Sequence, residues 1–157
     1  MRLALYQPDI PQNTGALMRL CACFGVGLDI IEPCGFPFSD SKLRRAGMDY
    51  IDLAAVTRHA SFSNFMNAKT GRLVLVETDG KTPYQKFTFA PYDVLIVGRE
   101  SAGTPREVYD AADESIFIPQ SQGRSLNVAL AAAITLSEAL RQTGQLPEMG
   151  QTLLASG

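Results

Sequence analysis

The chain between residues 118 and 129 reads Ile118-Pro119-Gln120-Ser121-Gln122-Gly123-Arg124-Ser125-Leu126-Asn127-Val128-Ala129, and it continues directly into an alanine-rich stretch. A short apolar strand is therefore followed by a polar loop and then by a helix. Ser125 or Asn127 can cap this helix by accepting hydrogen bonds from its first backbone N–H groups. Such a helix start also presents donors and a partial positive charge to a ligand in the loop.

Two other segments have the same build. Pro11-Gln12-Asn13-Thr14-Gly15 precedes a helix, and Val97-Gly98-Arg99-Glu100-Ser101-Ala102-Gly103-Thr104-Pro105 follows an apolar strand. Three polar, glycine-containing loops at strand ends predict one composite binding site, since ligands of α/β proteins bind at the carboxyl ends of strands.

The apolar pattern alternates between strands and helices. We expect strands at residues 3–6, 28–31, 51–56, 73–76, 94–97 and 116–118. We expect a first helix whose apolar face is formed by Leu17, Leu20, Cys21 and Phe24 and which ends at Gly25 or Gly27. Further helices are expected over the basic residues 42–46, after a cap at Ser61, and from Asn127 to about Thr143, where Gly144 follows. This alternation predicts a single α/β domain over residues 1–157, with a mostly parallel sheet, helices on both faces and a frayed tail over 145–157.

Composition narrows the functional classes. The chain has 157 residues, 46% of them hydrophobic, and a formal net charge of −2; its pI is about 5.4. This excludes a generally basic nucleic-acid-binding protein and leaves room for a local basic patch. The sequence begins with no signal pattern and has no apolar run of roughly 18 residues, so we expect a cytoplasmic protein with no membrane partner.

The cysteine and histidine content bears on redox state and metal binding. Cys21, Cys23 and Cys34 are an odd number in a chain of this length, which favours reduced thiols over a disulfide framework. His59 is the single histidine. A zinc site needs more thiols or imidazoles, so we expect no metal.

Several common α/β enzyme types lack their motifs here. Gly25-Val26-Gly27 lies before a strand instead of opening a helix, and no P-loop or nucleophile elbow occurs. A serine triad would depend on His59 alone, with no matching serine loop. Nicotinamide-dependent and nucleoside-triphosphate-dependent enzymes of the usual types are therefore disfavoured.

The order and spacing of the three loops resemble the three motifs of the SPOUT methyltransferases, in particular the TrmH-like 2′-O group. The matching residues are Asn13-Thr14-Gly15 with Arg19, the segment 97–105, and Ile118-Pro119 with Ser125-Leu126-Asn127-Val128-Ala129. Ile31-Glu32-Pro33 and Leu43-Arg44-Arg45-Ala46-Gly47-Met48-Asp49-Tyr50 resemble the minimal members that act on the tRNA wobble nucleotide.

This resemblance implies an S-adenosylmethionine-dependent transfer of a methyl group to the ribose 2′-hydroxyl of a cytidine or modified uridine at tRNA position 34. It also implies a homodimer and a C-terminal trefoil knot, which composition and periodicity would not predict because threaded chains are rare. Two alternatives remain open, namely a ribosomal RNA 2′-O-methyltransferase and a non-catalytic RNA-binding protein on the same fold.

The resemblance also places a cofactor site on this chain. The implied cofactor-binding residues are Glu77, Thr78, Gly98, Glu100, Gly103, Ile118, Pro119, Ser125 and Leu126. Gly98, Gly103 and Gly123 would let the backbone approach a ligand closely or take a positive φ; ordinary turn positions are the alternative.

The implied catalytic residues are Arg19, Asn13, Glu100, Ser125 and Asn127. Arg19 lies two residues from Leu17, so we expect it to point away from the apolar face and toward Asn13. A guanidinium stays protonated in proteins, so Arg19 would orient a phosphate and stabilise the developing alkoxide while the proton leaves to water, a phosphate oxygen or a carboxylate. A solvated surface arginine and a purely capping Asn127 are the alternatives.

The one dense basic stretch is the expected RNA contact. It consists of Lys42, Arg44 and Arg45, to which Arg58 is added. In an otherwise acidic chain these side chains are candidates for phosphate contacts with tRNA, and a dimer would double the basic surface. A solvated charged face is the alternative interpretation.

Overall fold

The computed structural model describes residues 1–39, 41 and 55–148. Its seven strands are β1 (Arg2–Tyr6), β2 (Gly27–Ile31), β3 (Val56–His59), β4 (Leu73–Val76), β5 (Thr82–Pro83), β6 (Val94–Val97) and β7 (Glu114–Phe117). They form one sheet in the order β3-β2-β1-β6-β4-β7-β5. Every pairing between these strands is parallel. The predicted α/β class with a parallel sheet is confirmed.

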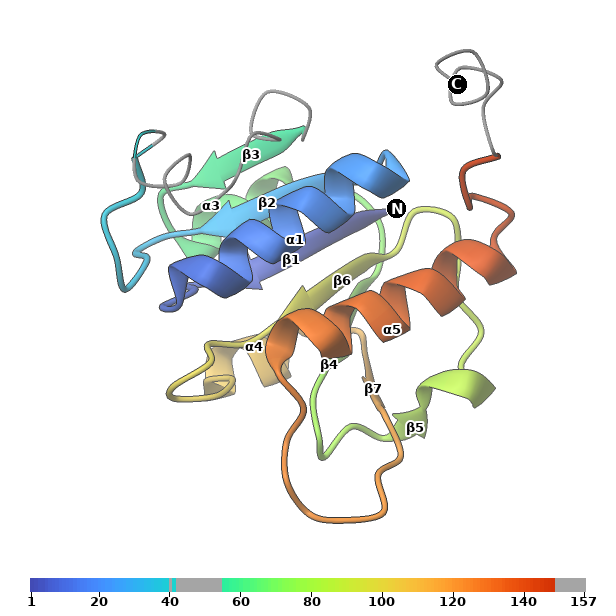
Figure 1. Cartoon of the computed structure of the whole chain (residues 1–157). Coiled ribbons are helices and arrows are strands. Elements are labelled where there is room, and N and C mark those ends of the chain that lie inside the picture. Colours follow the sequence, from blue (N-terminus) through green and yellow to red (C-terminus); the bar gives the residue numbers. More distant parts are fainter. Residues whose placement is uncertain (40, 42–54, 149–157) are drawn as a thin grey trace, which may run out of the picture.

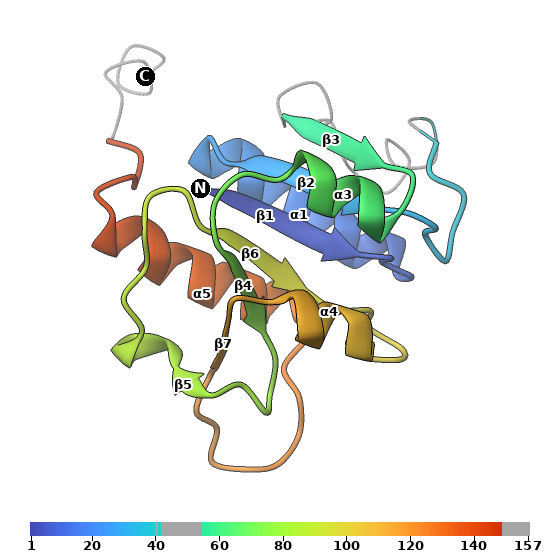
Figure 2. The ribbon, with the colours of Figure 1, turned by 180° about the vertical axis from the view of Figure 1, so that it is seen from behind.

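Helices cover both faces of the sheet. Figure 1 shows α1 (Pro11–Phe24) and α5 (Val128–Gln142) in front of it, and Figure 2 shows α3 (Phe62–Ala68) and α4 (Arg106–Ala111) on the opposite face. A three-residue 3-10 helix, η1 (Tyr84–Lys86), follows β5. The core is accordingly split into two clusters, one beneath α1 and α5 and one beneath α3 and α4.

The central strands read as continuous apolar runs because both of their faces are covered. β4 is Leu-Val-Leu-Val and β6 is Val-Leu-Ile-Val, and all eight residues are buried. Both strands begin and end at the predicted residues. A parallel sheet buried on both faces favours such uninterrupted β-branched and leucine-rich segments.

The helix ends follow the capping signals of the sequence. α1 ends at Gly25, which has φ 64°, and Ser61 caps α3 by accepting a hydrogen bond from the backbone N–H of Asn64. Asn127 caps α5 by accepting from the N–H groups of Ala129 and Leu130. Gly144, at φ 67°, follows the end of α5 as predicted.

Several expectations need correction or fall outside the described residues. In place of the strand expected at 51–56, β3 begins at Val56 and runs through the exposed residues Thr57 and Arg58. Residues 51–54, the helix expected over 42–46 and the part of the expected tail from residue 149 lie outside the described residues. The strand expected at 116–118 is β7, shifted to Glu114–Phe117. The sequence interpretation missed α4, β5 and η1.

The single histidine has a structural partner. His59 Nε2 lies 2.8 Å from Asp29 Oδ1, and Asp29 Oδ2 accepts from Arg2 Nε at 2.6 Å. Asp29 is only 5% exposed. Because a buried charge must be paired, these residues tie β1, β2 and β3 together at the edge of the sheet. All three cysteines are free.

Candidate functional site

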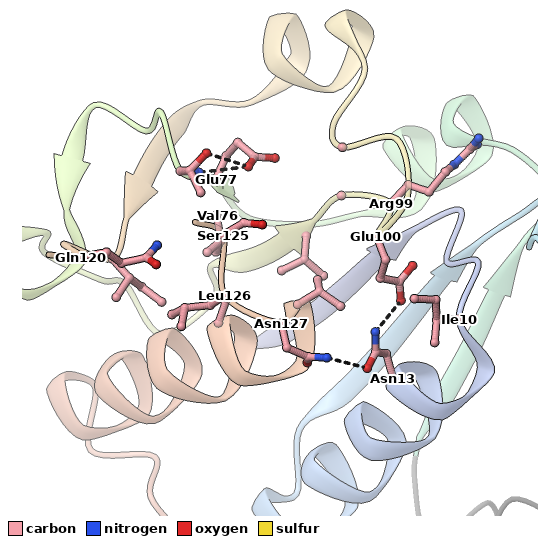
Figure 3. A pocket seen from close by; sticks show the side chains of 17 residues that line it. Ile10, Asn13, Val76, Glu77, Arg99, Glu100, Gln120, Ser125, Leu126 and Asn127 are labelled. Carbon is pink, nitrogen blue, oxygen red and sulfur yellow. Dashed lines mark hydrogen bonds between the residues drawn. The ribbon is translucent and has the colours of Figure 1, made fainter. Parts of the chain in front are cut away.

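The cavity at the carboxyl ends of four adjacent strands brings the three polar loops together. It has a volume of about 360 Å³, within the usual range for small-molecule sites. Figure 3 shows side chains from the segments after β1, β4, β6 and β7 and from the start of α5 pointing toward one space. The lining residues are Ile10, Asn13, Val76, Glu77, Thr78, Val97, Gly98, Arg99, Glu100, Gly103, Ile118, Gln120, Ser125, Leu126, Asn127, Val128 and Ala131.

The position of the cavity follows from the strand order. The chain leaves β1 toward β2 on one side and leaves β6 toward β7 on the other, although β1 and β6 are neighbours. Loops after such strands diverge and leave a crevice, which is where ligands bind in open α/β sheets.

Hydrogen bonds connect the three predicted segments across the cavity. The first of them, residues 11–15, was expected to precede a helix and instead forms the start of α1. Asn127 Nδ2 donates to Asn13 Oδ1 at 3.0 Å, and Asn13 Nδ2 donates to Glu100 Oε1 at 3.4 Å (Figure 3). These three side chains come from segments that are 87 and 114 residues apart in sequence. The bonds therefore fix the loops relative to one another and give Asn127 a role beyond capping.

Glu100 has a second carboxylate beside it. The backbone N–H of Asp9 donates to Glu100 Oε2 at 3.0 Å. Burial, followed by the side-chain hydrogen bond with Asp9, raises the pKa of Glu100 above its usual range. The same side-chain bond and Ser101 lower the pKa of Asp9. A proton taken up by the pair therefore resides on Glu100 first.

The loop after β6 is shaped by two glycines. A Cβ at Gly98 would lie 2.1 Å from Thr104 Oγ1, and that hydroxyl donates to Glu77 Oε2 at 2.8 Å. Gly103 has φ 69° and donates its backbone N–H to Arg99. Gly98 thus permits close packing of the loop, and Gly103 supplies the left-handed turn. Gly123 has open space around its Cα, so neither reason applies to it.

Most of the predicted site residues line the cavity. Of the expected cofactor-binding residues, Glu77, Thr78, Gly98, Glu100, Gly103, Ile118, Ser125 and Leu126 do so, and Pro119 does not. Of the expected catalytic residues, Asn13, Glu100, Ser125 and Asn127 line it. Arg19 is exposed on α1, in keeping with a side chain that points away from the apolar face, and it is not among the lining residues.

Sequence reasoning missed the apolar part of the wall. Ile10, Val76 and Ala131 line the cavity without having been named for it, and Val97 and Val128 had been named only as members of the motif segments. Val76 and Val97 are the last residues of their strands, and this position is the signal that could have identified them. Arg99 and Gln120 also line it.

The expected RNA-contacting residues are only partly described. Lys42, Arg44 and Arg45 lie outside the described residues. Arg58 is on β3, where its guanidinium pairs with Glu32 and its Cζ lies 4.4 Å from the centre of the Phe38 ring. Within residues 1–39, 41 and 55–148, no group of three His, Cys, Asp or Glu side chains could hold a metal ion, and no helix is long and apolar enough to span a bilayer.

Residues 1–137 match the model of the SpoU rRNA Methylase family. The chain belongs to this family. Relatives of this SpoU methylase include proteins named tRNA (cytidine(34)-2'-O)-methyltransferase from Beijerinckia indica, 57% identical with 94% of each chain covered, and from Escherichia coli K12, 40% identical with 92% of this chain and 94% of that protein covered.

Solved structures show the same fold as this SpoU methylase. One reported as "Structural insights into the 2-OH methylation of C/U34 on tRNA" has a TM-score of 0.84 and 38% identity, with 90% of this chain and 94% of that chain covered. The SpoU methyltransferase AviRb from Streptomyces viridochromogenes, in complex with AdoMet, has a TM-score of 0.81 and 25% identity. The alignment covers 90% of this chain and 60% of AviRb.

Proposed function

We propose that this protein transfers the methyl group of S-adenosylmethionine to the ribose 2′-hydroxyl of the wobble nucleotide of tRNA, a cytidine or modified uridine at position 34. The observation that carries this proposal is near-full-length similarity, at 57% and 53% identity, to two proteins named for that reaction. The cavity at the ends of β1, β6, β4 and β7 supplies a place for it.

The cavity suits a cofactor with apolar and polar parts. Val76, Val97, Ile118 and Leu126 offer apolar surface, as an adenine ring requires. Gly98, Gly103 and the backbone after β7 offer peptide groups for the polar atoms. The cofactor, when bound, supplies an activated methyl group on a sulfonium. The protein has to hold it, exclude water and orient the ribose.

Arg19 is proposed to act on the ribose or its phosphate from outside the cavity. It is exposed on α1, and a guanidinium there can hold a phosphate with two parallel hydrogen bonds. Lys42, Arg44, Arg45 and Arg58 are proposed to contact tRNA phosphates. Pro119 and the eight predicted cofactor residues that line the cavity are proposed to contact the cofactor.

A homodimer is proposed as the working assembly, in the cytoplasm, without a metal. α5 exposes Leu130 and Ile134, which are four residues apart and therefore form a row on one side of the helix. Leu130 is 58% exposed. A row of large apolar side chains on one helix is typical of a surface that another subunit covers. The C-terminal trefoil knot remains a prediction.

The direct test incubates the protein with labelled S-adenosylmethionine and unmodified tRNA, followed by mass spectrometry of the nucleosides. We expect a 2′-O-methyl group at position 34, and calorimetric binding of the cofactor without RNA. Methylation of ribosomal RNA instead would favour the alternative substrate. Binding of RNA with no cofactor binding would favour the non-catalytic alternative and overturn the proposal.

Two glycine variants form a matched pair for the cofactor site. Gly98→Ala places a Cβ against Thr104 and should weaken cofactor binding by displacing the loop, whereas Gly123→Ala enters open space and should change binding little. Equal affinities of both variants would show that the loop after β6 does not shape the cofactor site.

A further inference from the structure

We propose that Glu100 accepts the proton of the ribose 2′-hydroxyl during methyl transfer, and that Asp9 strengthens it as an acceptor by sharing that proton. The inference rests on the proposed function, because each methyl group moved to a hydroxyl releases one proton. Asp9 then acts as a positioning residue: it is not among the residues that line the cavity, and it works through Glu100.

The chemical step balances without a further reactant. The hydroxyl oxygen forms a bond to the methyl carbon while the carbon–sulfur bond breaks and leaves its electron pair on sulfur. The O–H bond breaks, its electrons remain on the ribose oxygen, and the proton moves to the Glu100 carboxylate. A sulfonium and a carboxylate thereby become a neutral thioether and a neutral acid.

The direction of the hydrogen bonds makes Glu100 an acceptor at both oxygens. Asn127 Oδ1 already accepts the capping N–H groups of α5, so the Asn127 amide must donate to Asn13 Oδ1. Asn13 Oδ1 is thereby an acceptor, and its Nδ2 donates to Glu100 Oε1. The N–H of Asp9 donates to Glu100 Oε2. The cap of α5 thus orients the Asn13 amide toward the Glu100 carboxylate.

Asp9 offers a place for one more proton. Its Oδ2 accepts a hydrogen bond from Ser101 Oγ, but its Oδ1 is buried and has no hydrogen-bond partner in the described part of the chain. A buried carboxylate oxygen without a donor is costly, and a proton held between Asp9 and Glu100 would supply one. Every buried oxygen of the two carboxylates therefore has a hydrogen-bond partner only after the pair has taken up a proton.

Electrostatics support Glu100 as the member that carries the proton. Burial and the bond to Asp9 raise the pKa of Glu100, and the bond to Glu100 lowers the pKa of Asp9. Two neighbouring carboxylates disfavour the doubly ionised state, so the pair takes up one proton more readily than an isolated glutamate.

The other charged groups nearby do not compete for this proton. The Arg99 guanidinium donates to Gln7 Oε1, and Arg58 pairs with Glu32. Burial is the main cause that raises the pKa of Cys34 to about 11, so its thiol stays protonated. Arginine side chains remain protonated in proteins and cannot accept it.

The test measures the single-turnover rate of methyl transfer to tRNA as a function of pH. Glu100 works when ionised, so the rate of the wild type should fall as the pH drops through the raised pKa of Glu100. Asp9→Asn removes the neighbouring charge, lowers that pKa and should move the acidic fall to lower pH. Glu100→Gln should abolish the fall and reduce the rate by about 100-fold or more. Glu114→Gln, on exposed surface, is the matched control.

A direct titration keeps the inference testable should the Asp9→Asn variant lose activity. Carbon-13 NMR of glutamate carboxyls should show one glutamate titrating above the usual range in the wild type and shifting down in Asp9→Asn. An unchanged pH profile in Asp9→Asn, or full activity of Glu100→Gln, would overturn the proton-acceptor role. If the wild type transfers no methyl group to tRNA at any pH, the proposed function fails instead.

Discussion

Arg19 and Asn13 lie on the same helix but in different surroundings. Asn13 lines the cavity and bonds to Glu100 and Asn127, whereas Arg19 lies on the exposed face of α1 with Gln12 and Ala16. Six residues separate the two positions, which is about 120° around an α-helix. Arg19 therefore projects from α1 in a different direction from the side chain that lines the cavity.

Arg19→Ala should separate catalysis from cofactor binding. We expect the affinity for S-adenosylmethionine to stay within twofold or so, because Arg19 does not line the cavity. Methyl transfer to tRNA should fall by about 100-fold, the order seen on removal of one transition-state donor. The measurements are calorimetry and single-turnover kinetics.

Arg106→Ala is the control for this experiment, because Arg106 is an exposed arginine on the other face of the sheet that pairs with Asp110. It should change neither quantity. If Arg19→Ala transfers methyl groups at the wild-type rate, Arg19 is a surface residue without a role in the reaction.

Individual site residues differed in how far the sequence predicted them. Asn13, Glu100 and Asn127 were named because they occur in motif-bearing loops, and all three line the cavity. Asp9 was not named: its partner Glu100 is 91 residues away, so no local pattern indicates the contact. A pair of this kind becomes visible only when β1 and β6 are seen as neighbours.

At the level of elements, the start of α5 both stabilises the helix and positions a side chain that lines the cavity. Asn127 Oδ1 caps the helix and Asn127 Nδ2 holds Asn13. The two halves of one amide can be tested separately, because a carboxylate can cap a helix but cannot donate a hydrogen bond.

Asn127→Asp should therefore keep stability and damage the site. The carboxylate retains the cap and is favoured at a helix N-terminus, so the free energy of unfolding in urea should change little, whereas Asn127→Ala should lose about 1 kcal/mol. Both variants should slow methyl transfer because neither can donate to Asn13. If Asn127→Asp transfers methyl groups as fast as the wild type, the bond to Asn13 has no role in the reaction.

The elements that sequence predicted best are those buried on both faces. β4 and β6 carry four consecutive apolar residues each, and such runs have clear limits. α4 escaped prediction because only Val108 of its six residues is buried, which leaves no periodicity. β3 was misplaced because Thr57 and Arg58 of this edge strand are exposed. Edge strands need less apolar sequence, so their pattern is weak.

On the scale of the whole molecule, the proposed dimer would cover the row of Leu130 and Ile134, which are exposed on α5. α1 and α5 contact each other on the same face of the sheet (Figure 1). The outer surfaces of both helices therefore lie on the same side of the sheet (Figure 1).

Leu130→Lys should shift the proposed dimer toward monomer. In a two-fold interface each subunit would bury one lysine charge, and each buried charge destabilises the dimer. Sedimentation velocity should show a dimer for the wild type and a smaller species for the variant. Tyr92→Lys is the control, since Tyr92 is 77% exposed but lies outside this row. A wild type that sediments as a monomer would contradict the assembly.

The path of the whole chain is the feature that local sequence reveals least. Alternating apolar patterns predicted the parallel sheet and helices on both of its faces, because the buried strands and the helices α1, α3 and α5 each leave an apolar pattern in the sequence. The strand order β3-β2-β1-β6-β4-β7-β5 depends on pairings between distant segments. A knot would likewise leave no local trace, and its expectation rests on the resemblance alone.

The central place of β1 has a consequence for synthesis of the protein on the ribosome. β1 pairs with β2 soon after it is made, but its other edge waits for β6, with Leu3 opposite Leu95. The bond from Asn127 to Asn13 spans 114 residues and forms later still. An apolar strand with an open edge is prone to pair with other chains. Nascent chains that stop before β6 should therefore aggregate, and the speed of translation between residues 31 and 94 sets how long that edge stays open.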